Sequence, residues 1–308
     1  MIFFIVTFFF FNILLFFYFE KFSNFVNLFD LPDGKRKIHK KPIAAIGGLL
    51  IFLNLFFYFI FLTSQYFFYD KYIFYSSNID FIIFYFFSSL FFLTGFLDDK
   101  FGIGPNFKLI LFTFIISLLL FFSESMSLRN LSFTFLENTI SIKTISFPFT
   151  VFCILLFINA FNMFDGINLQ SSIYSLHIFF IFLFQGLFLE ISIVMIFSLL
   201  FFSYLNYKNR CFLGNGGSLL VAFIISYLFI KSQSTPTPFF ADQIFLAMQI
   251  PGLDLLRLAI QRSVAGEHPF FPDRNHIHHL LLKKYGYKKT LLFLSGIIII
   301  PNFLSTVY

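Results

Sequence analysis

The chain has 308 residues, of which 58% are hydrophobic and 12% charged, and its formal net charge is +6. Soluble domains carry about a quarter charged residues, so this chain has too few charges to cover a water-facing surface. Its apolar residues lie in long blocks, which indicates a polytopic membrane protein and argues against a soluble nucleic-acid-binding protein. The two cysteines, Cys153 and Cys211, form neither a disulfide pattern nor a metal-binding spacing.

Ten apolar blocks predict membrane-spanning helices, since about 20 apolar residues cross the hydrocarbon core of a bilayer. They lie at residues 2–19, 43–62, 80–97, 108–122, 146–163, 171–188, 190–206, 216–231, 239–258 and 290–307. The ninth block contains Pro251-Gly252, and we expect it to bend or break there. The long loop 123–145 alternates weakly between polar and apolar residues and predicts a small hairpin. The chain is therefore expected to be an all-α bundle of about ten helices in one domain, residues 1–308.

Basic residues are distributed unevenly over the two sides of the predicted bundle. The loops after the odd-numbered blocks, together with the adjoining helix ends, hold 17 of the 21 Lys and Arg residues, and the other side holds four. Because loops rich in Lys and Arg stay in the cytoplasm, the sequence predicts that both termini face outward. Most of the polar residues suited to chemistry then fall on the cytoplasmic side.

The loop after the first block is strongly basic and contains Lys37 and His39. Two interpretations stay open for it. The charges could anchor the protein beside anionic lipid, or they could bind the phosphate of a lipid substrate.

Two adjacent carboxylates, Asp98 and Asp99, follow the uncharged run from Phe81 to Leu97. Carboxylates at a membrane boundary are costly to desolvate, so they stay in water, meet a cation or do chemistry. Adjacent helical residues point about 100° apart, so both can face one ion only if the helix has ended. Gly102 and Gly104-Pro105 favour such an ending. The pair then suits Mg²⁺ held by one or two carboxylates and substrate phosphates; a solvated helix end is the alternative.

The fifth block ends in Asn159, Asn162 and Asp165, followed by Gly166. Residues three apart are neighbours on one helix face, and the glycine can end the helix. Amides and a carboxylate at this position suit a polar ligand or a metal. Hydrogen bonding between helices is the alternative use of such residues in membranes.

The loop after the ninth block gathers Arg274, His276, His278 and His279 behind Pro272-Asp273. Zinc is disfavoured, because cysteine ligands are missing and the nearby carboxylates favour hard cations. Imidazoles and a guanidinium can instead bind phosphate or sugar hydroxyls. The glycines that open the eighth block could hold an anion on backbone amides, or they could form a flexible turn.

Four motifs occur in order in the predicted cytoplasmic loops. They are Leu97-Asp98-Asp99-Lys100-Phe101-Gly102, Asn159-Ala160-Phe161-Asn162-Met163-Phe164-Asp165-Gly166, Phe212-Leu213-Gly214 and Pro272-Asp273-Arg274-Asn275-His276-Ile277-His278-His279. With them the chain resembles the polyprenyl-phosphate N-acetylhexosamine-1-phosphate transferases. The form of the last motif is similar to the branch that uses simple UDP-N-acetylhexosamines, not to the phospho-muramoyl-pentapeptide transferases.

The resemblance implies a helix bundle with a cytoplasmic catalytic cleft in the bacterial inner membrane. It implies transfer of a sugar-1-phosphate, such as GlcNAc-1-phosphate, from a UDP-sugar to undecaprenyl phosphate. UMP is released, and the product initiates a cell-envelope polysaccharide. Mg²⁺ is the implied cofactor, with Mn²⁺ as an alternative, and a homodimer stays open.

The resemblance also implies roles for individual residues. The implied catalytic residues are Asp98, Asp99 and Asp165, and the implied metal ligands are the same three with Asn215. The residues expected to bind substrate are Asn159, Asn162, Arg274, His276, His278, His279, Lys37 and His39.

Two departures from the family pattern qualify these expectations. Asn215 stands where the family usually has an aspartate, and Asn168-Leu169-Gln170 stands where the family often continues Asp-Gly-Leu. Weaker metal binding, altered sugar choice and a catalytically impaired paralogue are the alternatives. A non-enzymatic transport or lipid-binding protein is disfavoured, because it would place charges along a path through the bilayer and show paired repeats.

Overall fold

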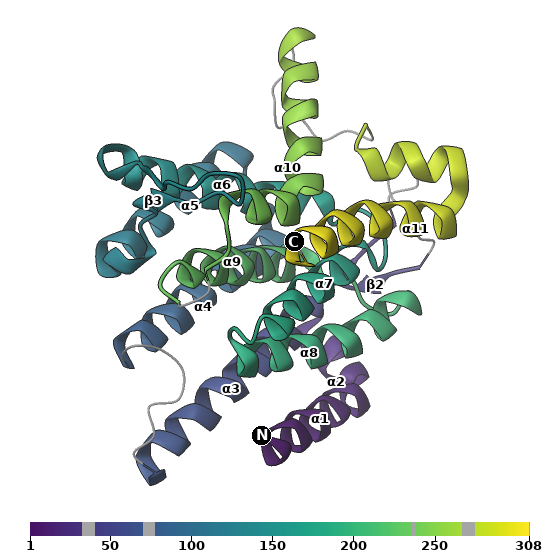
Figure 1. The fold of residues 1–308 in the computed structure, drawn as a ribbon. Coiled ribbons are helices and arrows are strands. Elements are labelled where there is room, and N and C mark those ends of the chain that lie inside the picture. The colour runs from purple at the N-terminus through teal and green to yellow at the C-terminus, as the bar shows by residue number, and fades with distance from the viewer. Residues whose placement is uncertain (33–40, 70–77, 236–237, 267–274, 308) are drawn as a thin grey trace. The chain divides into compact units, whose positions relative to one another are not determined.

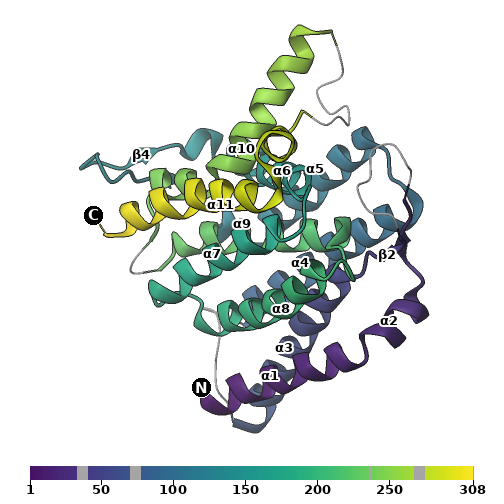
Figure 2. The ribbon, with the colours of Figure 1, turned by 90° about the vertical axis from the view of Figure 1, so that its right-hand side faces the viewer.

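A computed structural model describes residues 1–32, 41–69, 78–235, 238–266 and 275–307 of the chain (Figure 1). This part of the chain is mainly helical, as the second view also shows (Figure 2). The helices are α1 (Ile2–Phe17), α2 (Phe19–Val26), α3 (Gly47–Tyr69), α4 (Asn78–Phe101), α5 (Pro105–Phe122), α6 (Ser146–Phe164), α7 (Gln170–Phe184), α8 (Leu189–Tyr207), α9 (Gly214–Ser232), α10 (Ala241–Val264) and α11 (Ile277–Val307). Two short 3₁₀ helices are η1 (Glu124–Met126) and η2 (Lys143–Ile145).

The predicted all-α class is confirmed, and each of the ten predicted blocks coincides with a helix. Among the described residues, seven helices are long and apolar enough to cross a membrane, or eight if the bent pair α1–α2 counts as one span. The helix α7 is shorter, and α11 is kinked at Gly286, where φ is 74°. The helix α10 is continuous across Pro251, so no break occurs there.

The strands are short and lie in connections between helices. The strand β1 (Phe29–Asp30) pairs antiparallel with β2 (Ile43–Ala44). The strand β3 (Asn130–Leu131) pairs antiparallel with β4 (Ile140–Ser141), which confirms the small hairpin predicted in loop 123–145.

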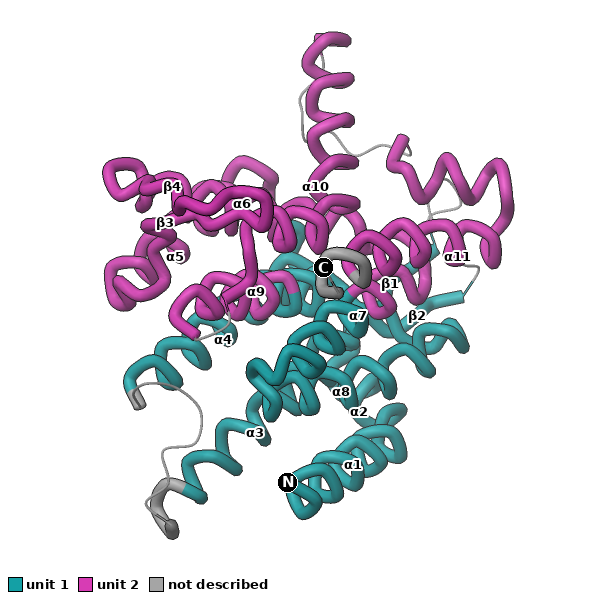
Figure 3. Tube along the Cα trace, viewed as in Figure 1, with its two compact units in different colours: residues 1–103, 175–221 teal, residues 104–174, 222–308 magenta. Residues whose placement is uncertain are grey.

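The chain divides into two compact units (Figure 3). It passes from one unit to the other within α7 and again within α9. Unit 1 comprises Met1–Ile103 and Ser175–Val221. Within it α3 packs against α1, α4 and α8. A buried amide pair joins two of these helices, since Asn12 Nδ2 donates to Asn54 Oδ1 (2.7 Å) and Asn54 Nδ2 donates to Asn12 Oδ1 (3.1 Å). Such reciprocal bonds satisfy polar groups that have no access to water.

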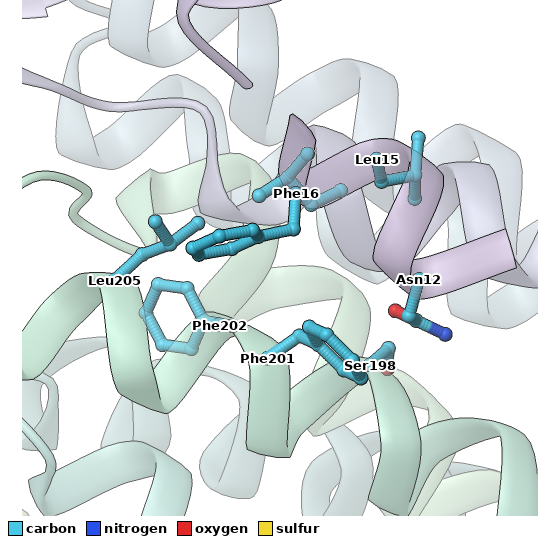
Figure 4. Close-up of a pocket in the computed structure, with 8 residues that line it drawn as sticks. Asn12, Leu15, Phe16, Ser198, Phe201, Phe202 and Leu205 are labelled. Atoms are coloured by element: carbon cyan, nitrogen blue, oxygen red, sulfur yellow. The ribbon is translucent and has the colours of Figure 1, made fainter. Parts of the chain in front are cut away.

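A small, mainly apolar pocket also lies in unit 1, between α1, α3 and α8 (Figure 4). Asn12 and Ser198 are the polar side chains in its lining, and phenylalanine and leucine side chains form the remainder. The pocket contains no residue of the predicted site, so we assign it to helix packing.

Glycines let the first turn of α9 approach α3 and α4 in unit 1. A Cβ atom on Gly48 would lie 2.2 Å from the backbone nitrogen of Gly217, and one on Gly95 would lie 2.3 Å from the carbonyl oxygen of Asn215. The Gly48 N–H donates to the carbonyl of Leu213 at 2.9 Å. These backbone contacts fix where α9 begins.

Unit 2 comprises Gly104–Tyr174 and Ala222–Tyr308. Within it α6 packs against α5 and α10, and α10 packs against α11. The Tyr174 hydroxyl donates to the carbonyl of Ala247 in α10 at 2.8 Å. At the start of α10, the Asp242 carboxylate accepts the backbone N–H of Thr134 at 2.9 Å, which ties the hairpin to this helix.

Candidate active site

The helix α4 continues through both adjacent aspartates and ends only at Phe101. The helix ending that Gly102 favours is observed, but it follows the pair, so both aspartates lie within the helix. The left-handed conformation needed to leave the helix becomes available at Gly102, where φ is 70°. Because both aspartates are helical, their side chains diverge. The buried Asp98 accepts the backbone N–H of Ile103 on Oδ1 at 2.8 Å.

The Asp99 carboxylate caps the first turn of α9. Its Oδ1 accepts the backbone N–H of Asn215 at 2.9 Å, and its Oδ2 accepts that of Gly216 at 3.0 Å. The first N–H groups of a helix have no partner within it, and the helix dipole attracts negative charge to this end. A Cβ atom on Gly214 would lie 2.6 Å from Oδ2 of Asp99, and φ at Gly214 is 71°. The glycine-rich turn thus does hold an anion on backbone amides, and that anion is a carboxylate of the same chain.

The end of α6 carries the second predicted group, which lies in unit 2. Asp165 directly follows the last residue of α6, and its Oδ1 accepts a hydrogen bond from the Ser171 hydroxyl. The Asn159 amide donates to the Leu155 carbonyl of its own helix at 2.7 Å. Asn162 lies between them in the sequence and is half-buried.

The buried His278 packs directly against the backbone at Gly166. A Cβ atom on Gly166 would lie 1.9 Å from His278 Nε2, so only glycine leaves room for the ring in this position. On the other side of the ring, Nδ1 of His278 is 3.5 Å from the Gln170 amide nitrogen. Two motifs far apart in the sequence therefore meet here. Gln170, one of the residues that depart from the family pattern, is part of the contact.

Leu169, another of these departures, has a backbone φ of 67°. This is a conformation that glycine adopts freely and that costs other residues roughly 1–2 kcal/mol. We expect Leu169→Gly to be more stable than Leu169→Ala by about 1 kcal/mol, because both variants lose the side chain but only glycine relieves the strain. Thermal unfolding of the purified variants in one detergent measures the difference. A more stable alanine variant would contradict the interpretation.

A carboxylate outside the predicted set, Asp254 in α10, binds the start of α11. Its Oδ2 lies 2.9 Å from His276 Nδ1, and its Oδ1 accepts the backbone N–H of Ile277 at 3.1 Å. Arg257 Nη2 donates to the same Oδ1 at 2.8 Å. The sequence carried one signal for this residue: Asp254 is an ionisable residue within an apolar block, which marks a functional candidate.

The three histidine rings lie close together at the start of α11. The rings of His276 and His278 are nearly parallel, with centroids 5.4 Å apart, and those of His278 and His279 lie 4.3 Å apart. The predicted residues Lys37, His39 and Arg274 lie outside the described part of the chain. Asp98, Asp99 and Asn215 belong to unit 1, whereas Asn159, Asn162, Asp165 and the histidines belong to unit 2.

Within the described ranges, no three His, Cys, Asp or Glu side chains are grouped closely enough to hold a metal ion. The predicted ligand positions offer carboxylate and amide oxygens, which is the donor chemistry that Mg²⁺ prefers. Mg²⁺ commonly binds one or two carboxylates and completes its coordination with substrate phosphates. The donor types therefore fit a cation that shares its ligands with a phosphate substrate.

The pKa of His278 falls from its ordinary value of 6.5 to about 3, because the ring is buried and also lies near His279 and His276. This residue lies in the first turns of α11, outside the helix segments apolar enough to span a membrane. The unfolded chain takes up a proton below about pH 6.5 and the folded chain does not, so stability is lost as the pH falls.

We expect acidification from about pH 7.5 to about pH 5.5 to lower the free energy of unfolding by about 1 kcal/mol through this residue. Thermal unfolding at both pH values measures the loss, with His278→Gln as the matched variant. If acidification lowered the free energy of unfolding of His278→Gln by the same amount, groups other than His278 would be the cause.

Comparison with known proteins shows that the chain is similar to glycosyl transferases. The family model "Glycosyl transferase family 4" matches residues 81–233, which include Asp98, Asp99, Asp165 and Asn215. The undecaprenyl-phosphate alpha-N-acetylglucosaminyl 1-phosphate transferase of Thermotoga maritima is 28% identical over 289 residues, covering 92% of this chain and 83% of the relative. The protein of the same name from Escherichia coli K12 is 26% identical over 275 residues, covering 85% and 71%.

Proposed function

Because the chain belongs to glycosyl transferase family 4, we propose that it transfers an N-acetylhexosamine 1-phosphate from a UDP-sugar to undecaprenyl phosphate and releases UMP. The relatives named above, which cover most of this chain, support a polyprenyl-phosphate sugar-phosphate transferase. GlcNAc-1-phosphate is the proposed group, since those relatives carry it in their names. The product would initiate a cell-envelope polysaccharide.

The observation that carries the proposal is the contact between Gly166 and His278. It joins the motif at the end of α6 to the histidine cluster of α11 in one folded unit. Phosphoryl transfer requires mainly positioning and neutralisation of phosphate oxygens. The histidines supply hydrogen-bond donors and acceptors for a sugar diphosphate, and Asp165 and Asn162 supply polar contacts beside them.

The proposed reaction is a direct displacement. An oxygen of the lipid phosphate attacks the β-phosphorus of the UDP-sugar, and the bond from this phosphorus to the bridging oxygen breaks. The bridging oxygen leaves with UMP, and the sugar-1-phosphate becomes part of a lipid diphosphate. Asp98 is assigned to the acceptor phosphate, as its base or as an oxygen ligand of the cation.

Mg²⁺ would neutralise charge on the diphosphate, and the candidate oxygen ligands that the family resemblance implies are Asp98, Asp165 and Asn215. We assign Asp99 a positioning role, because both of its oxygens accept N–H groups of α9. The site is proposed to face the cytoplasm, with both termini outward, on the basis of the distribution of Lys and Arg.

The test is UMP release by the purified protein with undecaprenyl phosphate and a panel of UDP-sugars. We expect turnover with UDP-GlcNAc that requires the lipid and is abolished by EDTA and restored by Mg²⁺ or Mn²⁺. Asp98→Asn is the matched inactive variant. Absence of turnover with every donor would favour a catalytically impaired paralogue, and a trapped phospho-aspartate would overturn direct displacement.

A further inference from the structure

A single buried carboxylate organises the start of α11. Asp254 has 6% of its surface exposed and lies within the apolar helix α10. A buried charge is strongly unfavourable unless it is paired and hydrogen-bonded. Asp254 meets this requirement with four donor atoms, namely His276 Nδ1, the Ile277 backbone N–H, and Arg257 Nε and Nη2.

These bonds set the orientation of the His276 ring. An ionised carboxylate only accepts hydrogen bonds, so the proton between the two side chains sits on Nδ1 of His276. In the neutral ring Nε2 is then the unprotonated nitrogen. No described residue forms a hydrogen bond with Nε2, and the ring stacks on His278.

Arg257 strengthens the same arrangement. It lies one helical turn after Asp254 and neutralises its charge, with the Arg257 side chain 40% exposed and the Asp254 side chain 5% exposed. The same guanidinium donates to the carbonyl of Asn275, the residue before His276. Side chains of α10 thus bind both the backbone and the ring of the histidine segment.

We propose that Asp254 is the positioning residue for His276, fixing its ring with Nδ1 protonated and Nε2 available to the UDP-sugar. The inference rests on the proposed function and adds a residue to its site. Misplacing a contacting group by about 1 Å can lower a rate by about 100-fold. A purely structural Asp254 would instead stabilise the junction of α10 and α11 without acting through the His276 ring.

A double-mutant cycle separates these two roles. Asp254→Asn, His276→Gln and the double variant are compared in kcat/KM for UMP release and in thermal unfolding. We expect each single variant to lose about 100-fold in kcat/KM, and the double variant to lose no more than His276→Gln alone. Asp242→Asn is the matched control, because Asp242 lies at the other end of α10 and bonds Thr134. We expect this control to keep its activity within a factor of about 2.

Two outcomes would overturn the proposal. One is that Asp254→Asn lowers kcat/KM by the same factor in the wild-type protein and in the His276→Gln variant. The other comes from ¹⁵N-histidine NMR of the wild-type protein, in which the His276 signal is identified by its loss in His276→Gln. We expect the Nδ1–H tautomer, and the Nε2–H tautomer would refute the proposed orientation. Wild-type protein inactive with every donor would refute the proposed function instead, and the NMR result would still decide the orientation.

Discussion

Asp99→Asn is expected to lower the free energy of unfolding by about 2–4 kcal/mol. Hydrogen bonds to a charged group contribute about 1.5–3 kcal/mol, and a buried donor left unpaired costs about 1–3 kcal/mol. The carboxylate accepts two backbone N–H groups of α9, at 2.9 and 3.0 Å. An asparagine offers one oxygen and one NH₂ group, so one helix N–H would face another donor. The attraction between the carboxylate and the helix dipole would also be lost. Thermal unfolding of the purified protein measures the effect.

Asp98→Asn is the matched comparison, since Asp98 is the neighbouring residue on the same helix. Its Oδ1 accepts the backbone N–H of Ile103, and the asparagine oxygen can still accept it. We therefore expect Asp98→Asn to unfold near the wild-type temperature and to lose UMP release. Equal destabilisation by both variants would show that Asp99 has no special role in holding α9.

Gly95→Ala is expected to destabilise the protein by about 3 kcal/mol or to prevent folding, since overpacking costs about 1–3 kcal/mol and occasionally more. The added Cβ atom would lie 2.3 Å from the carbonyl oxygen of Asn215 and 2.6 Å from the nitrogen of Gly216. Both neighbours are backbone atoms of α9, so α4 and α9 would have to separate. That movement would also break the contact between Asp99 and α9. Yield of folded protein and its unfolding temperature measure the effect.

Gly252→Ala is the control for this substitution. Gly252 also lies inside a long apolar helix, α10, but a Cβ atom there would meet nothing within 4 Å. Alanine is the better helix former by about 1 kcal/mol, so we expect this variant to be unchanged or slightly more stable. A Gly95→Ala protein as stable as Gly252→Ala would contradict the close approach of α4 and α9.

The helices were predictable because crossing a membrane is a local property of the sequence. A block such as 146–163 is long and apolar, and the structure has α6 at Ser146–Phe164. Helix ends were less predictable. The helix α4 runs past Asp98 and Asp99 to Phe101, since the first glycine able to end it is Gly102.

The residue types of the candidate site were visible in the sequence, whereas most of their partners were not. The acidic pair looked like two equivalent carboxylates, yet Asp99 binds the start of α9 and Asp98 binds its own helix end. The contact between Gly166 and His278 joins segments that no local pattern connects. Asp254 was visible as a charge in an apolar block, but its bond to His276 was not.

The sequence by itself determined the membrane class, the helical blocks, the uneven charge and the motifs that carry the family resemblance. These properties depend on composition and on residues close together in the chain. Only the tertiary structure decided which polar atoms meet, how Asp98 and Asp99 differ, and why Gly48 and Gly95 leave no room for a side chain. The physical reason is that a hydrogen bond or a close backbone contact depends on positions a few ångströms apart in space, and packing between distant helices sets those positions.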